Sequence, residues 1–246
     1  MEVIDQHRSI RKYKDDPVPQ EILDKILNAA IRASNTGNMQ MYSIIVTTDK
    51  DIKKELSPCH FNQPMVNQAP VILTFCADIN RFSKWCELRG AKPEYDNFLW
   101  FLNGMTDAIL ASGNAALEAE THGLGICYLG TTLYTAEKIC DILELPQGVV
   151  PVTTLVVGYP DGTPELTDRL PLEGVIHKNK YREYTDQNIE DIWKEKENSE
   201  ETGKLIEING LPNLARVFTD KRYTGKDNQA FSDSYMAVLK KQGFLK

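Results

Sequence analysis

The chain of 246 residues has few of the side chains that build disulfide frameworks or metal centres. Its five cysteines are odd in number and form no C-x-x-C pair, and its four histidines form no HxxxH or HExxH arrangement. Most cysteines lie in apolar runs such as Val71–Cys76, which predicts buried free thiols in a reducing compartment. Cys59-His60 is too isolated to indicate zinc. We therefore expect neither disulfides nor a bound metal.

Long apolar runs and an excess of positive charge are also lacking. No apolar run is long enough to cross a bilayer, and Met1–Asp5 has neither the basic nor the apolar region of a secretory leader. The formal net charge of -7 argues against a nucleic-acid or anionic-membrane surface, because both need a basic footprint. We expect a cytoplasmic protein with no nucleic-acid partner and no membrane contact, in which an anionic ligand would be bound locally.

Motifs of nucleophilic catalysis and of nucleotide binding are missing as well. The chain contains no GxSxG elbow and no P-loop. Gly123-Leu124-Gly125 followed by Gly130 suggests a dinucleotide fingerprint, but these glycines are expected to close a helix and open an extended segment. A Rossmann turn needs the reverse order, with the phosphate at a helix N-terminus. The sequence therefore argues against a Rossmann site.

With 41% hydrophobic residues, the chain can bury a core in one or two domains. Apolar residues at helical spacing predict an amphipathic helix over Gln20–Ala33, and a polar loop, Ser34–Gln40, follows it. The other expected elements are strands at 42–48, 71–77 and 149–158, an extended segment at 124–130, helices at 49–56, 135–143, 185–202 and 228–242, and an irregular stretch at 209–226.

The stretch Asn97–His122 predicts a long helix of unusual composition. Its apolar residues spread round more than one face, which is typical of a helix central to a large core or shared with another subunit. Gly104 and Gly113 interrupt it at a cost of about 1 kcal/mol each relative to alanine. We expect another backbone or a ligand to come close at these two glycines.

The first eleven residues end in His7-Arg8-Ser9-Ile10-Arg11, a cluster of side chains suited to phosphate. A guanidinium group matches phosphate oxygens with two parallel donors, and histidine and serine can each donate a further bond. The cluster therefore indicates a bound, nucleotide-like anion. Two arginines three residues apart are also typical of a solvated helix face, and from these residues alone both interpretations stay open.

Further motifs follow in order: the polar loop ending in Gln40, Gln63 ahead of Ala69-Pro70, Gly-Leu-Gly and then Tyr128-x-Gly130, and Gly158-Tyr159-Pro160 before Arg169-Leu170-Pro171. Together with His-Arg-Ser-x-Arg, this order and spacing resembles the nitroreductase family of FMN-dependent oxidoreductases. Within that family it resembles the larger oxygen-insensitive nitroreductases and related flavin reductases. The resemblance covers residues 7 to about 182 and, weakly, 234–244.

The resemblance implies roles for individual residues. His7, Arg8 and Ser9 would hold the FMN phosphate and ribityl end, and Arg169 would close on the phosphate from a distant loop. Arg11 would lie near the pyrimidine end of the flavin, where positive charge favours the anionic reduced form. The cofactor would be lined by Asn35, Thr36 and Gln40, and Gln63 would hydrogen-bond the polar edge of the flavin ring. The residues that would pass along the ring are Tyr128, Leu129, Gly130 and Thr131. Core packing is the alternative for Tyr128 and Leu129.

The sequence departs from the larger nitroreductases in two places. Thr167 stands where they often carry a second cation beside the arginine that matches Arg169. The segment 209–226 only loosely resembles the basic region that grips the extra phosphate of NADPH in some members. NADPH and NADH therefore both stay open as the reductant.

The resemblance also implies an α+β fold with a mostly antiparallel central sheet flanked by helices, completed by dimerisation. Residues 1–185 would form the FMN-binding domain, and residues 186–246 a C-terminal helical extension packed on the same fold or on the partner subunit. The implied homodimer would use NAD(P)H to reduce nitroaromatics, quinones or related flat acceptors by ping-pong hydride transfer through flavin N5, with no catalytic side chain. NAD(P)H:flavin reductase activity and a non-catalytic flavin-binding or storage role are alternatives.

Overall fold

The computed structural model describes residues 2–245, so Met1 and Lys246, the outermost residues of the two expected domains, lie outside it. These residues divide into two compact units, of which the smaller is Leu166–Ala230 and the larger is the remainder. The expected domain boundary at residue 185 stays a prediction. The two units are defined by contacts within the chain, which do not show where a cofactor-binding domain ends.

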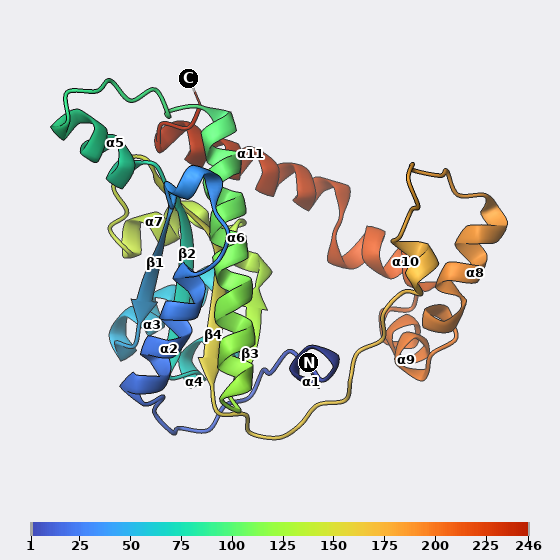
Figure 1. The fold of residues 1–246 in the computed structure, drawn as a ribbon. Coiled ribbons are helices and arrows are strands. Elements are labelled where there is room, and N and C mark those ends of the chain that lie inside the picture. Colours follow the sequence, from blue (N-terminus) through green and yellow to red (C-terminus); the bar gives the residue numbers. More distant parts are fainter. Residues whose placement is uncertain (1, 246) are drawn as a thin grey trace. The chain divides into compact units, whose positions relative to one another are not determined.

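The larger unit is built on a four-stranded sheet in the order β1-β2-β4-β3 (Figure 1). Every neighbouring pair is antiparallel. The strands are β1 (Tyr42–Thr47), β2 (Val71–Asp78), β3 (Gly125–Leu129) and β4 (Val149–Gly158). The three expected strands and the extended segment are confirmed, and with the surrounding helices they give an α+β fold.

Helices surround this sheet, and among residues 2–245 none combines the length and hydropathy needed to cross a bilayer. The last helix, α11 (Gly225–Lys241), begins in the smaller unit and ends in the larger one. The others of the larger unit are α1 (Glu2–Asp5), α2 (Gln20–Ile31), α3 (Lys50–Leu56), α4 (Pro64–Gln68), α5 (Asn80–Leu88), α6 (Phe98–Thr121) and α7 (Ala136–Ile142).

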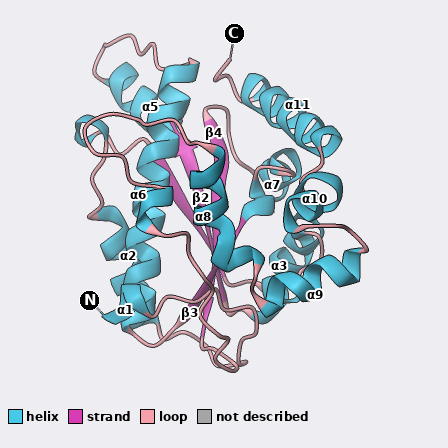
Figure 2. Ribbon diagram, turned by 90° about the vertical axis from the view of Figure 1, so that its right-hand side faces the viewer, coloured by secondary structure: helices cyan, strands magenta, loops and turns pink. Residues whose placement is uncertain are grey.

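Two apolar cores lie on the two faces of the sheet, because successive strand residues point to opposite sides. Phe75 and Leu155 pack with α2 and α6, whereas Ile72 and Val156 pack with α3, α4 and α7. Figure 2 shows the strands between these two helical layers. All five cysteines are buried and unpaired, as expected.

Helix α6 has two very different sides. Small residues face the core, and a Cβ added at Gly104 would lie 2.7 Å from the Met41 carbonyl oxygen, so the expected close approach is confirmed there. At Gly113 no atom of the described chain comes within 4 Å of an added Cβ. The opposite side carries large apolar side chains that are 36% to 62% exposed: Phe98, Leu99, Leu102, Ile109, Leu110 and Leu117. We call these six residues the exposed face of α6.

The smaller unit corrects two expectations. The helix expected over 185–202 is two helices, α8 (Asp186–Glu197) and α9 (Glu200–Asn209), because the Ser199 hydroxyl accepts the Thr202 N–H and starts a new helix. The stretch 209–226 is not irregular, since it contains α10 (Leu214–Val217) and a π-helical turn at Phe218–Arg222. Helical segments of four or five residues are too short to show an apolar repeat in the sequence.

Candidate functional site

The cluster His7–Arg11 lies along the outer edge of β3. Ser9 pairs with Ile126 in a parallel bridge, and the Ile10 N–H donates to the Ile126 carbonyl at 2.8 Å. Gly125 permits this contact, since a Cβ there would lie 2.4 Å from Ile10 Cγ1. Helix α1 ends at Asp5, before the cluster. The alternative of a solvated helix face is therefore wrong, and the cluster is extended backbone on a sheet edge.

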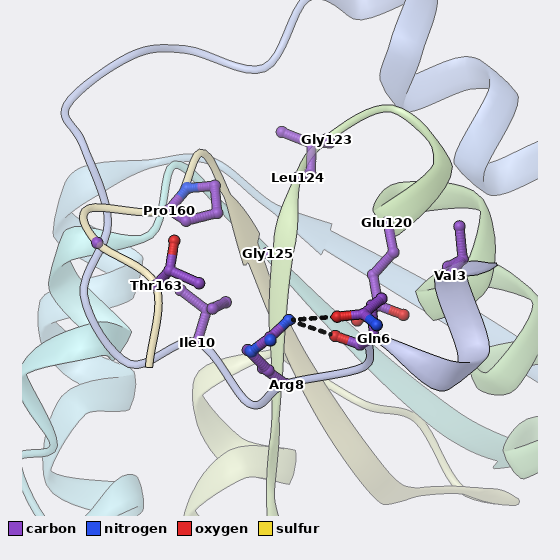
Figure 3. A pocket seen from close by; sticks show the side chains of 11 residues that line it. Val3, Gln6, Arg8, Ile10, Glu120, Gly123, Leu124, Gly125, Pro160 and Thr163 are labelled. Atoms are coloured by element: carbon purple, nitrogen blue, oxygen red, sulfur yellow. Dashed lines mark hydrogen bonds between the residues drawn. The ribbon is translucent and has the colours of Figure 1, made fainter. Parts of the chain in front are cut away.

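The Arg8 side chain borders a cavity of about 380 Å³ at this edge (Figure 3). Its NH1 donates to the Gln6 carbonyl at 2.9 Å, whereas Nε is buried and has no hydrogen-bond partner among the described residues. A buried donor without a partner costs about 1–3 kcal/mol, more when charged, so Arg8 is suited to a bound anion. The other lining residues are Val3, Gln6, Ile10, Glu120, Gly123, Leu124, Gly125, Pro160, Gly162 and Thr163.

His7 is tied to α6 by a contact that the sequence did not reveal. His7 Nδ1 lies 2.7 Å from Glu120 Oε1, and the Glu120 side chain is only 13% exposed. Glu118, two residues earlier, instead pairs with His122 at 3.0 Å, because residues two apart do not face each other on a helix. Glu120, which lines the cavity, therefore positions the His7 ring.

The segment Tyr128–Thr131 consists of the last two residues of β3 and the first two residues of the turn that follows. The Tyr128 hydroxyl donates to Ser112 Oγ at 3.2 Å, and 40% of the tyrosine stays exposed. Leu129 is buried in the core on the α7 side, so packing accounts for its side chain. An added Cβ at Gly130 meets no atom within 4 Å in the described chain, which leaves open space above that backbone.

His60 joins Gln63 to this segment. His60 Nδ1 lies 2.8 Å from Thr131 Oγ1, and Gln63 Nε2 donates to the His60 carbonyl at 3.0 Å. Burial lowers the pKa of His60 to about 4, so its imidazole is neutral near pH 7. His60 thus connects Gln63 to Thr131. From the sequence alone, His60 is considered only as a zinc ligand, and its isolated position argues against that role.

The stability of the fold is expected to depend on His60 below neutral pH. The folded-state pKa is about 4 and the ordinary value 6.5, so between them the unfolded chain binds the proton more strongly. The free energy of unfolding should fall by up to roughly 3 kcal/mol as the pH drops through this window. Urea unfolding at several pH values, with and without His60→Asn, measures this. Identical pH slopes for parent and variant would contradict it.

The loop that contains Asn35, Thr36 and Gln40 is fixed by Asp107, a buried carboxylate of α6. Asp107 Oδ1 accepts the Thr36 N–H at 2.9 Å and the Thr36 hydroxyl at 3.1 Å, and Oδ2 accepts the Met41 N–H at 3.3 Å. Gln40 has a φ of 54° and its N–H donates to Asn35 Oδ1. The sequence signal for this anchor is a carboxylate in the middle of an apolar helix, and the family motifs do not include it.

This loop lies far from the His7–Arg11 cluster of the same chain. It precedes β1, and β1 and β3 are opposite edges of the sheet, about 14 Å apart at roughly 4.8 Å per strand. Tyr42 of β1 aligns through β2 with Val150 of β4, whereas Ile126 of β3 aligns with Val157. The stretch of β4 from Val150 to Val157 spans about 23 Å. One chain therefore does not bring Asn35–Gln40 to His7–Arg11.

Two expected site arginines have exposed side chains. Arg11 follows the bridge to β3, and its charge acts on Cys127 and Tyr13, which places it beside that strand. Arg169 belongs to the smaller unit, where its NH1 donates to Thr167 Oγ1 at 2.7 Å and to the Asp168 carbonyl at 2.9 Å. The closure of Arg169 on a phosphate stays a prediction.

Known proteins resemble this chain in sequence and fold. The model of the Nitroreductase family matches residues 4–159. A Bacillus subtilis protein named FMN reductase (NAD(P)H) is 41% identical over 177 residues, 71% of each chain. The oxygen-insensitive NADPH nitroreductase of Salmonella typhimurium is 35% identical over 184 residues, 74% of each chain. A Bacteroides fragilis protein of known crystal structure is 47% identical, with a TM-score of 0.99 and 100% of both chains covered.

The family model extends over the motif at the edge of β3, the anchored loop and the segment after β3, which are the features that the motif order had singled out. Both relatives match over more than two thirds of either chain. This chain belongs to the nitroreductase family.

Proposed function

We propose that this chain is an FMN-dependent oxidoreductase that uses NAD(P)H to reduce nitroaromatics, quinones or related flat acceptors. The observation that carries the proposal is the buried, unpartnered Nε of Arg8 at a cavity beside β3. The names of two relatives, an FMN reductase and an NADPH nitroreductase, support the same reaction class. Steady-state oxidation of NADPH and NADH with a nitroaromatic and with a quinone tests it, and no acceptor-dependent turnover would contradict it.

The residues at the edge of β3 fit the phosphate end of FMN. A phosphomonoester carries about -1.5 to -2 charge, and a guanidinium binds it with short, charge-assisted hydrogen bonds. Arg8 would donate to the phosphate from its unpaired Nε. His7 would donate from Nε2, the ring nitrogen that does not contact Glu120, and Ser9 would donate from its hydroxyl. Arg169 is proposed to complete the site. Because the chain carries a net charge of -7, such convergence is required to hold a dianion.

The segment after β3 fits the ring end. Gly130 offers backbone with open space above it, so a flat ring can approach closely. Tyr128, Leu129 and Thr131 would pass along the ring, Gln63 would bond its polar edge, and Arg11 would favour the anionic reduced form. Bound FMN supplies hydride transfer between NAD(P)H and the acceptor. The chain itself binds and orients, and no acid or base side chain is assigned.

A flavin reductase with free FMN as the acceptor is the second candidate, and the name of the 41% identical relative favours it. The same residues would serve both reactions, so the site does not separate them. Initial rates with free FMN and with a nitroaromatic, at equal enzyme and NADPH concentrations, decide between them. A flavin-binding or storage role would be favoured if neither nicotinamide reduces the bound cofactor.

We propose that the chain acts as a homodimer in which the loop of Asn35, Thr36 and Gln40 lines the FMN of the partner subunit. That loop lies too far from His7–Arg11 to join them within one chain. The exposed face of α6, with open space at Gly113, offers an apolar surface for the second copy. A cytoplasmic location is proposed too, since five buried free thiols suit a reducing compartment.

The dimer is expected to depend on Leu110, which is 45% exposed on α6. Leu110→Glu should weaken association at least about 10-fold, because two-fold symmetry would place two carboxylates in one apolar interface. Analytical ultracentrifugation over a range of concentrations measures this. Leu88→Glu, at a leucine of α5 that is 79% exposed, is the control and should leave the dimer intact. A monomeric parent, or an unaffected Leu110→Glu dimer, would rule the proposal out.

A further inference from the structure

A group of three aromatic rings lies next to the segment that is proposed to hold the flavin ring. Tyr134 and Phe231 stack with centroids 4.2 Å apart and an interplanar angle of 13°. Phe61 lies 6.3 Å from Tyr134 and 6.5 Å from Phe231. All three residues belong to the larger unit, and we call them the aromatic platform.

Phe61 is held in a backbone conformation that a bulky residue rarely adopts. Its φ and ψ are 56° and 34°, in the left-handed region, and the next residue, Asn62, has a φ of 53°. This conformation is strained for a residue that carries a Cβ atom. The ring gains little burial in return, because 54% of Phe61 is exposed. Packing within this chain therefore does not explain why a half-exposed phenylalanine adopts a strained backbone conformation.

The surroundings fix Phe61 beside the ring end of the site. The preceding residue, His60, is bonded to Thr131 at 2.8 Å, and the Asn62 N–H donates to the Ser57 carbonyl at 2.9 Å. The Tyr134 N–H donates to the Thr131 carbonyl at 3.0 Å. Thr131, one of the residues assigned to the flavin ring, is thus hydrogen-bonded to Tyr134 and to His60, the residue before Phe61. The platform is therefore preorganised at the edge of the proposed site.

We propose that the exposed face of Phe61, backed by Tyr134 and Phe231, binds the planar aromatic acceptor while it receives the hydride. This inference rests on the proposed function. Packed aromatic rings stabilise each other beyond the burial of area, and the negative face of a ring suits electron-poor nitroaromatics and quinones. A ring without hydrogen-bonding groups selects for flatness rather than for one substituent pattern. The acceptor class is thus neutral, flat and aromatic or quinonoid.

The test uses Phe61→Gly in the FMN-loaded protein. Glycine adopts the left-handed conformation without strain, so the free energy of unfolding should be unchanged or higher. The KM for a nitroaromatic and for a quinone should rise about 5- to 10-fold, while the FMN content and the anaerobic rate of flavin reduction by NADPH stay within about twofold of the parent. Phe61→Trp, which keeps an aromatic face, should restore the acceptor KM.

The control is Glu144→Gly, which relieves the same kind of strain at an exposed residue with a φ of 51°. It should leave the acceptor KM unchanged. An unchanged acceptor KM in flavin-loaded Phe61→Gly overturns the proposal, and so does a dissociated dimer, which would make Phe61 an interface residue. A rise confined to the nicotinamide KM overturns it as well. A parent protein that binds no FMN contradicts the proposed function itself, which is a separate and distinguishable result.

Discussion

Replacing Arg8 with alanine is expected to weaken FMN binding at least about 100-fold. The Nε donor is buried without a partner, so a phosphate would meet a group already free of water and of competing acceptors. Hydrogen bonds to charged groups contribute about 1.5–3 kcal/mol each, and alanine removes the whole guanidinium fork. Titration of the apoprotein with FMN, followed by flavin fluorescence, gives the two dissociation constants.

Two further variants test whether the loss is specific to the guanidinium group of Arg8. Arg8→Lys keeps the positive charge but loses the planar fork, so its affinity should lie between those of the parent and Arg8→Ala. Arg89→Ala removes an exposed arginine at the end of α5 and should bind FMN like the parent. Equal FMN affinity in Arg8→Ala and the parent would refute the phosphate assignment. Equal losses in Arg8→Ala and Arg89→Ala, with Arg8→Lys binding like the parent, would point to net charge instead of a specific contact.

Asp107→Ala should be the most destabilising single change in the site. The substitution leaves the Thr36 N–H, the Thr36 hydroxyl and the Met41 N–H without their shared acceptor. Orphaned buried donors cost about 1–3 kcal/mol each, so we expect a loss of about 3–5 kcal/mol in the free energy of unfolding. Urea denaturation measures it.

The same change should also weaken FMN binding, because the loop it releases is proposed to reach the cofactor of the partner subunit. In a mixed dimer, Asp107→Ala on one chain should therefore impair the site to which the other chain contributes Arg8. Asp24→Ala is the control, since Asp24 of α2 is exposed and should change stability by less than about 0.5 kcal/mol. A stable Asp107→Ala protein with full FMN content would contradict both parts.

Much of the larger unit could be predicted from local patterns. The helix expected over Gln20–Ala33 is observed as Gln20–Ile31, and the strand expected over Val149–Gly158 has those bounds. In such elements burial on one face or on both imposes a period that single residues reveal. The glycines at 123 and 125 also behave as expected, since Gly123, with a φ of 71°, follows the end of α6 and Gly125 begins β3.

Less of the site could be predicted from the sequence, because its geometry depends on contacts between residues that are distant in the chain. Glu120, Asp107 and His60 each fix a predicted site residue across 71 to 113 positions of sequence. A carboxylate inside an apolar helix, or a histidine beside a cysteine, has no periodic pattern, so the partner of neither can be predicted from the sequence. Only the order of the family motifs indicates that His7, Gln63 and Tyr128 share one site, and the loop of Asn35–Gln40 is proposed to join the site from a second chain.

The most direct test of the whole account is anaerobic reduction of the purified protein by NADPH, followed in its visible absorption spectrum. We expect a yellow protein with one FMN per chain, whose flavin band bleaches on addition of NADPH or NADH and returns when a nitroaromatic or a quinone is added. A colourless protein that does not take up FMN on reconstitution would contradict it, and so would a bound flavin that neither nicotinamide reduces.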